Sequence, residues 1–175
     1  MNNNFHLTLL DDDRNFLQIL TIGLQEKFKI QAFNEADAVL GYLMQNPTDG
    51  VILDLEDSVA LPKKDEARIL VRNALRSVDF YGAERMVRIN QGPRGLDDLD
   101  CLIPHNVHLV LVPKCESGES LRAVDERSEI IKAKHGIKTP VFLMPIIESS
   151  LGVENAFAIA TATKNVVALA IGLED

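Results

Sequence analysis

Charged side chains stand directly after apolar runs at several places in this chain, and these residues have the types and spacing for chemistry. The run 51–55 is apolar apart from Asp54 and leads into Glu56 and Asp57. Later apolar runs end at further polar residues: Arg88 and Asn90, Lys114, Glu148, and Glu174 with Asp175. Carboxylates bind hard cations, and arginine and lysine bind anionic groups. The pattern therefore indicates an active site assembled from several strands.

The elements that must position these residues alternate between strand and helix patterns. Short runs rich in branched apolar residues predict buried strands, and longer segments with helical spacing separate them. Repeated βα units predict an α/β fold with a parallel sheet, whose ligand site lies at the carboxyl ends of its strands. We expect strands over 6–10, 29–33, 51–55, 86–90, 108–113, 141–145 and 166–172. We expect helices over 15–27, 35–44, 65–75, 119–134 and 152–163, with a short one from residue 95.

Seven strands are one fewer than a complete (β/α)8 barrel requires, and such a barrel typically takes about 250 residues. The fold expected is therefore a partial TIM-barrel-like sheet, an open sheet, or a barrel that another chain closes. The sequence has 175 residues, shows no long linker, and is expected to form a single α/β domain. An incomplete barrel exposes sheet edges, so we expect a homo-oligomer.

The overall charge limits the possible partners of the chain. The formal net charge is −8, which disfavours a nucleic-acid or anionic-membrane surface. No apolar run approaches the roughly 20 residues that cross a bilayer, and no secretory signal is visible. Cys101 and Cys115 match no metal motif and are interpreted as free thiols. These observations predict a cytoplasmic protein that acts on small molecules.

Five ordered motifs between about residues 50 and 175 resemble the citrate lyase beta-subunit family, which includes the malyl-CoA lyases. They are DLEDSVALPKKDEAR (54–68), ERMVRIN (84–90), LVLVPKCES (110–117), PIIESSLGVENAFAIA (145–160) and VVALAIGLED (166–175). The resemblance implies a Mg²⁺-dependent carbon–carbon lyase. Such an enzyme cleaves a 3-hydroxy acyl thioester, carried by coenzyme A or an acyl carrier protein, to an acyl thioester and a keto acid such as oxaloacetate or glyoxylate.

The same resemblance implies a role for each candidate residue. Glu148 and Asp175 would hold Mg²⁺, and Arg88 would bind the carboxylate of the keto acid. Glu56 and Asp57 would position water or assist proton transfer. A further residue, Lys114, would bind an anionic group of the thioester carrier. Because the chain ends on the second metal ligand, activity is expected to be impaired.

Each of these residues also has a purely structural interpretation. The acids at 148 and 175 could be solvated strand ends, and Lys114 could be an exposed lysine. Arg88, which stands in an otherwise buried strand, could form a salt bridge with Glu56 or Asp54, because a buried arginine is rarely unpaired. The acids at 56 and 57 could cap the following helix or face solvent.

The segment from about residue 7 to 55 resembles the first half of a response-regulator receiver domain. Carried over, Asp11 and Asp12 would bind Mg²⁺ and Asp54 would accept phosphate. This segment would form a βαβαβ unit that shares the strand 51–55 with the citrate-lyase-like part. Two alternative functions follow: a receiver-like signalling or interaction module, and an inactive recombined or designed fold chimera.

Overall fold

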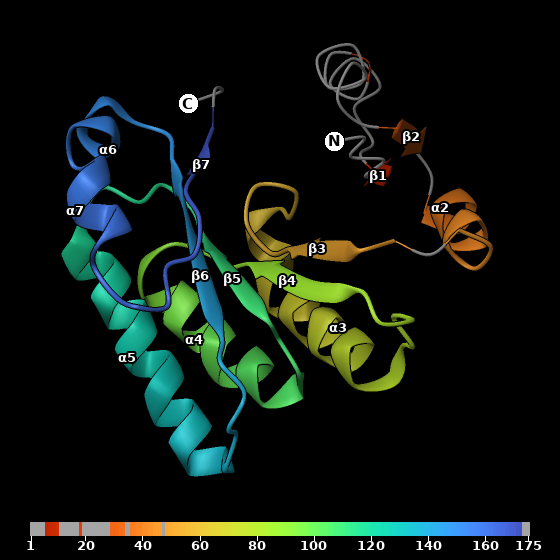
Figure 1. The fold of residues 1–175 in the computed structure, drawn as a ribbon. Coiled ribbons are helices and arrows are strands. Elements are labelled where there is room, and N and C mark those ends of the chain that lie inside the picture. The colour runs from red at the N-terminus through yellow and green to blue at the C-terminus, as the bar shows by residue number, and fades with distance from the viewer. Residues whose placement is uncertain (1–5, 11–17, 19–28, 34–35, 47, 173–175) are drawn as a thin grey trace. The chain divides into compact units, whose positions relative to one another are not determined.

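The computed structural model describes residues 6–10, 18, 29–33, 36–46 and 48–172 (Figure 1). The chain divides into two compact units. The first comprises residues 1–51 with 81–83, and the second comprises residues 52–80 with 84–175. In the described parts of both units, no helix is long and apolar enough to cross a membrane.

Among its described residues, the first unit contains a parallel pair of strands and a helix over 36–43. Strands β1 (His6–Leu10) and β2 (Lys29–Phe33) pair in parallel, with His6 opposite Lys29 and Leu10 opposite Phe33. The helix α2 (Ala36–Leu43) follows, and the rings of Phe33 and Tyr42 lie 5.1 Å apart. These strands and this helix confirm the sequence-based prediction. Asp11 and Asp12 lie outside the described residues, as does the helix expected over 15–27 apart from residue 18.

The second unit is built on a five-stranded parallel sheet with the strand order β3-β4-β5-β6-β7. The strands are β3 (Gly50–Asp54, whose first two residues belong to the first unit), β4 (Glu84–Arg88), β5 (Leu109–Val112), β6 (Phe142–Ile147) and β7 (Ala170–Ile171). The helices between them are α3 (Lys64–Ser77), α4 (Gly92–Leu102), α5 (Gly118–His135), α6 (Ser150–Glu154) and α7 (Ala156–Ala160), with 3₁₀ turns at Leu61–Lys63 and Ile103–His105. Each strand leads back to its neighbour through a helix, as in a half-barrel.

The main apolar core lies between this sheet and its helices, and α3, α4 and α5 cover one face of the sheet (Figure 1). Successive side chains of a strand point to opposite faces. On β5, Val110 and Val112 accordingly join the core on the helix side, whereas Leu109 and Leu111 join a smaller cluster with Ile146. All four β5 residues are buried, which explains the uninterrupted apolar sequence of this strand.

Three elements differ from the sequence-based expectation. The expected helix over 152–163 divides into α6 and α7 at Asn155, whose side-chain amide donates to the backbone carbonyl of Glu116 at 2.9 Å. The last strand is limited to Ala170–Ile171, preceded by a single bridge between Leu143 and Val166. Helix α4 begins at Gly92 because Pro93 suits a first helical turn.

The expected sheet of seven strands is not confirmed. The seven strands divide into the pair β1-β2 and the five-stranded sheet. The observed α/β half-barrel of five parallel strands corresponds to the coarser prediction of a partial barrel. It brings the carboxyl ends of neighbouring strands to one rim, where the candidate site residues stand.

Candidate active site

The turn after β3 is held in one conformation by the side chain of Asp54. One oxygen of this carboxylate accepts the backbone N–H of Glu56 at 2.8 Å, and the other accepts the N–H of Ser58 at 3.3 Å. From α3, the ammonium group of Lys64 donates to the carbonyl of Leu55 at 2.8 Å and also to that of Glu56. The turn therefore presents Glu56 and Asp57 at a fixed place.

Arg88 lies at the carboxyl end of β4, beside this turn, and its backbone carbonyl accepts the N–H of Leu55 at 2.9 Å. The guanidinium contacts Asp54 in a bidentate manner, with Nε 2.8 Å from Oδ1 and Nη2 2.5 Å from Oδ2. Its third nitrogen, Nη1, lies 3.6 Å from both Glu56 Oε2 and Asp57 Oδ2. The Arg88 guanidinium thus contacts three carboxylates. The salt bridge with Asp54 or Glu56, which the structural interpretation of Arg88 predicted, is present.

The pKa values of Asp54 and Glu56 are shifted in opposite directions. Burial raises the pKa of Asp54, but hydrogen bonds from Arg88 and from the backbone of Glu56 outweigh it, and the net pKa is lowered. Burial raises the pKa of Glu56, and the neighbouring Asp57 carboxylate raises it further, against opposing contributions from Gln91 and Arg88. The surroundings therefore favour the charged form of Asp54 and the protonated form of Glu56.

One oxygen of Glu56 is partly satisfied and the other is not. The side-chain amide of Gln91 donates to Glu56 Oε1 at 2.8 Å. Glu56 Oε2 is buried and has no hydrogen-bond partner among the described atoms. Buried polar atoms are normally paired, so an unpaired one suggests a role in binding or catalysis.

Glu148 and Lys114 form a second group on the same rim of the sheet. Glu148 directly follows β6, and its Oε2 accepts the backbone N–H of Lys114 at 2.7 Å. Lys114, two residues beyond β5, has a positive φ of 47°. A cleft of about 380 Å³ is lined by Lys114, Glu116, Glu148, Ser149 and Ser150.

Close packing fixes Glu148 from the side of β7. A Cβ atom on Gly172 would lie 2.5 Å from Glu148 Cγ, so only glycine allows this approach. The Glu148 carboxylate supplies the hard oxygen donors that Mg²⁺ prefers. Asp175, the second expected ligand, lies outside the described residues. Within residues 6–172 as far as the structure describes them, no group of three or more His, Cys, Asp or Glu could hold a metal ion.

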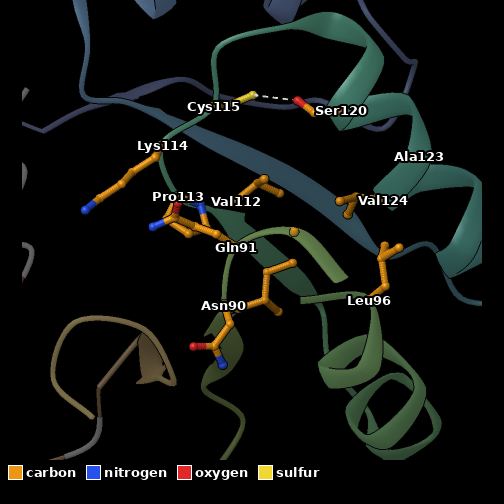
Figure 2. A pocket seen from close by; sticks show the side chains of 12 residues that line it. Asn90, Gln91, Leu96, Val112, Pro113, Lys114, Cys115, Ser120, Ala123 and Val124 are labelled. Carbon is orange, nitrogen blue, oxygen red and sulfur yellow. Dashed lines mark hydrogen bonds between the residues drawn. The ribbon is translucent and has the colours of Figure 1, made fainter. Parts of the chain in front are cut away.

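A separate pocket of about 270 Å³ lies between the loops that follow β4 and β5 (Figure 2). Its lining includes Asn90, Gln91, Lys114 and Cys115, and the thiol of Cys115 lies 4.0 Å from the hydroxyl of Ser120. Burial raises the pKa of this thiol, so it stays protonated at neutral pH. Both Cys101 and Cys115 are free.

The structure thus places Asp54, Glu56, Asp57 and Arg88 in one cluster and Lys114 with Glu148 in another. The two clusters stand at the carboxyl ends of β3 with β4 and of β5 with β6. Sequence reasoning missed Gln91, which carries no charge, although it directly follows the strand expected over 86–90. It also missed Asp98, a completely buried acid of α4.

Curated relatives are similar to this chain over most of its length. It is 36% identical over 132 residues to the citrate lyase subunit beta of Leuconostoc mesenteroides subsp. cremoris, covering 73% of this chain and 43% of that protein. It is 31% identical over 147 residues to the L-malyl-CoA/beta-methylmalyl-CoA lyase of Rhodobacter capsulatus, covering 79% and 45%. The chain therefore spans less than half the length of these relatives.

Solved structures share the fold. A citrate lyase from Burkholderia xenovorans LB400 matches with a TM-score of 0.65 at 19% identity, covering 97% of this chain and 48% of the other. The citrate lyase beta subunit of M. tuberculosis, complexed with oxaloacetate and magnesium, matches with a TM-score of 0.56 at 24% identity, covering 99% and 60%.

The resemblance of residues 7–55 to a receiver domain is not supported by these comparisons. Both of these solved structures align with nearly the whole chain, which leaves the interpretation as a chimera equally unsupported. The sequence profile described as HpcH/HpaI aldolase/citrate lyase matches residues 34–175, and so begins within that segment. With its half-barrel, its ordered motifs and this match, the chain belongs to the HpcH/HpaI aldolase/citrate lyase family.

Proposed function

We propose that this chain carries the catalytic half of a Mg²⁺-dependent carbon–carbon lyase. It would cleave a 3-hydroxy acyl thioester to a keto acid, oxaloacetate or glyoxylate, and an acyl thioester. The observation that carries the proposal is the Arg88 cluster, which stands on the same rim of the sheet as Glu148. The names of the relatives, citrate lyase and malyl-CoA lyase, support this class of reaction.

Arg88 is proposed to bind the carboxylate of the keto-acid part of the substrate. Asp54 fixes the guanidinium plane through Nε and Nη2, and such preorganisation lowers the entropy lost on binding. The side chain of Arg88 is 22% exposed, so solvent reaches it. The guanidinium stays positively charged, because the hydrogen bond to Asp54 raises its pKa.

Glu56 and Asp57 are proposed to move the proton. In this reaction the 3-hydroxyl loses a proton, the adjacent carbon–carbon bond breaks, and its electron pair passes to the thioester as an enolate. The enolate carbon then takes up a proton. A carboxylate with a raised pKa is a better base for the first step and a usable acid for the last.

Glu148 and Asp175 are proposed to hold Mg²⁺. The ion would supply Lewis acidity to the oxygen of the forming keto group. Lys114, whose backbone positions Glu148, is proposed to bind an anionic group of coenzyme A or of an acyl carrier protein arm. The expectation of a homo-oligomer belongs to the same proposal.

The test is the release of glyoxylate from malyl-CoA and of oxaloacetate from citryl-CoA in the presence of Mg²⁺. We expect release that EDTA abolishes and that Arg88→Lys lowers by at least tenfold, because lysine keeps the charge but lacks the planar fork. Arg94→Lys is the matched control, since Arg94 pairs with the exposed Asp65. Equal rates in the Arg88→Lys variant and the unmodified protein would contradict the assignment.

A further inference from the structure

Gln91 contacts Glu56 in the Arg88 cluster, although it belongs to none of the five motifs of the sequence. It precedes α4 and occupies the N-cap position, yet its side chain makes no capping hydrogen bond to the helix. Instead, the amide donates across 35 residues of sequence to Glu56 Oε1 at 2.8 Å. The side chain of Gln91 therefore serves Glu56 and not the helix that it begins.

The turn that carries Gln91 is fixed by a buried carboxylate. Asp98 Oδ2 accepts both the backbone N–H and the side-chain amide of Asn90 at 2.8 Å, and Asp98 Oδ1 accepts Nε of Arg68 at 2.6 Å. A Cβ atom on Gly95 would lie 2.1 Å from the carbonyl of Asn90. Helix α4 and this turn thus pack too tightly for Gln91 to shift easily.

The remaining contacts of Glu56 show what the amide achieves. The charged groups that face Glu56 are Asp57 on its own turn and Arg88 from β4, while Lys64 from α3 contacts its backbone carbonyl. With Oε1 occupied by Gln91, the unpaired Oε2 is the oxygen that lies 3.6 Å from Arg88 Nη1. The amide therefore orients the Glu56 carboxylate so that its second oxygen faces Arg88.

We propose that Gln91 is a positioning residue that occupies one oxygen of Glu56 and directs the other toward the Arg88 site. The inference rests on the proposed function for the part that Glu56 plays in the reaction. The effect of Gln91 on Glu56 can be measured without turnover, because a neutral N–H donor that contacts a carboxylate favours its ionised form. Loss of the donor must therefore change how Glu56 titrates.

The test is an NMR titration of glutamate side chains labelled with ¹³C at the carboxyl carbon, with Glu56 assigned from Glu56→Gln. Gln91→Met keeps the length of the side chain and removes the donor. We expect the Glu56 titration midpoint to move to higher pH in Gln91→Met. Gln45→Met, at an exposed position of the first unit, is the control and should leave the midpoint unchanged.

An unchanged Glu56 midpoint in a Gln91→Met variant with native amide shifts would overturn the proposal. The keto-acid assay gives a second readout, in which Gln91→Met should lower kcat by at least threefold with little change in KM. If the unmodified protein releases no keto acid, the proposed function fails, and the titration still decides whether Gln91 positions Glu56.

Discussion

Asp54 and Glu56 are two residues apart, yet their surroundings shift their pKa values in opposite directions. Asp54 is stabilised as an anion by Arg88 and by two backbone N–H groups. Glu56 is buried beside Asp57 and is destabilised as an anion. The same cluster therefore contains one acid that supports the fold when charged and one that opposes it.

This contrast predicts opposite effects of neutralising the two acids. The folded pKa of Asp54 is lowered, so its stabilisation is present above the unfolded pKa of about 3.9 and is lost as the pH falls through the folded pKa. Asp54→Asn should lower the free energy of unfolding at pH 7 by about 1–2 kcal/mol. The folded pKa of Glu56 is raised, so its charged form costs stability at higher pH.

Glu56→Gln should therefore be as stable as the unmodified protein or more stable at pH 7. Its advantage should disappear below about pH 4, where the acid is protonated in both folded and unfolded states. Urea unfolding between pH 3 and pH 8 measures both variants. A Glu56→Gln variant that loses stability at pH 7 and regains it in acid would show that the pKa shift has the other sign.

At the scale of elements, one buried ion pair ties α3, α4 and the end of β4 together. Asp98 has no exposed side-chain surface and pairs with Arg68, whose side chain is 16% exposed. Its other oxygen holds Asn90 at the start of the β4–α4 turn. These contacts place Gln91, so the stability of α4 and the geometry of the site depend on the same carboxylate.

Asp98→Ala should destabilise the second unit by about 3–5 kcal/mol, because it leaves Arg68 and Asn90 without their buried partner. Asp100→Ala is a matched control on the same helix. Asp100 pairs with Arg127 at the surface, with side chains 40% and 42% exposed, and its loss should cost less than about 1 kcal/mol. Equal losses in urea unfolding would argue against the role given to Asp98.

The order of the strands and helices could be predicted from the sequence, because each buried parallel strand has a short, nearly uninterrupted apolar sequence. Glu56, Asp57 and Glu148 could be located for the same reason, since they follow these runs, and Arg88 could be located as a charged residue within such a run. The break at Asn155 and the shortness of β7 could not be predicted, because the apolar pattern of the sequence runs on through 152–163 and through 166–172. Gln91 and Asp98 act through partners 35 and 30 residues away, which no local pattern reveals.

At the scale of the whole molecule, the five-stranded sheet has β7 at its edge. Near this edge the side chain of Ile171 is 74% exposed, and on α7 that of Phe157 is 82% exposed. Open edges and exposed apolar side chains favour self-association. We therefore predict a homo-oligomer, measured by light scattering, whose mass falls toward that of a monomer in Phe157→Ser. A monomer at high concentration would contradict this.

The central claim is that the rim with Arg88 and Glu148 binds a keto acid together with Mg²⁺. The direct test is the melting temperature with Mg²⁺ and oxaloacetate, each alone and together. At 100 times Kd, binding adds about 2.7 kcal/mol, which raises Tm by roughly 5–10 °C in a protein of this size. We expect this rise in the unmodified protein and in Glu119→Ala, an exposed control on α5, but not in Glu148→Ala. A cooperative melt that neither ligand shifts, or a shift that survives Glu148→Ala, would contradict the account.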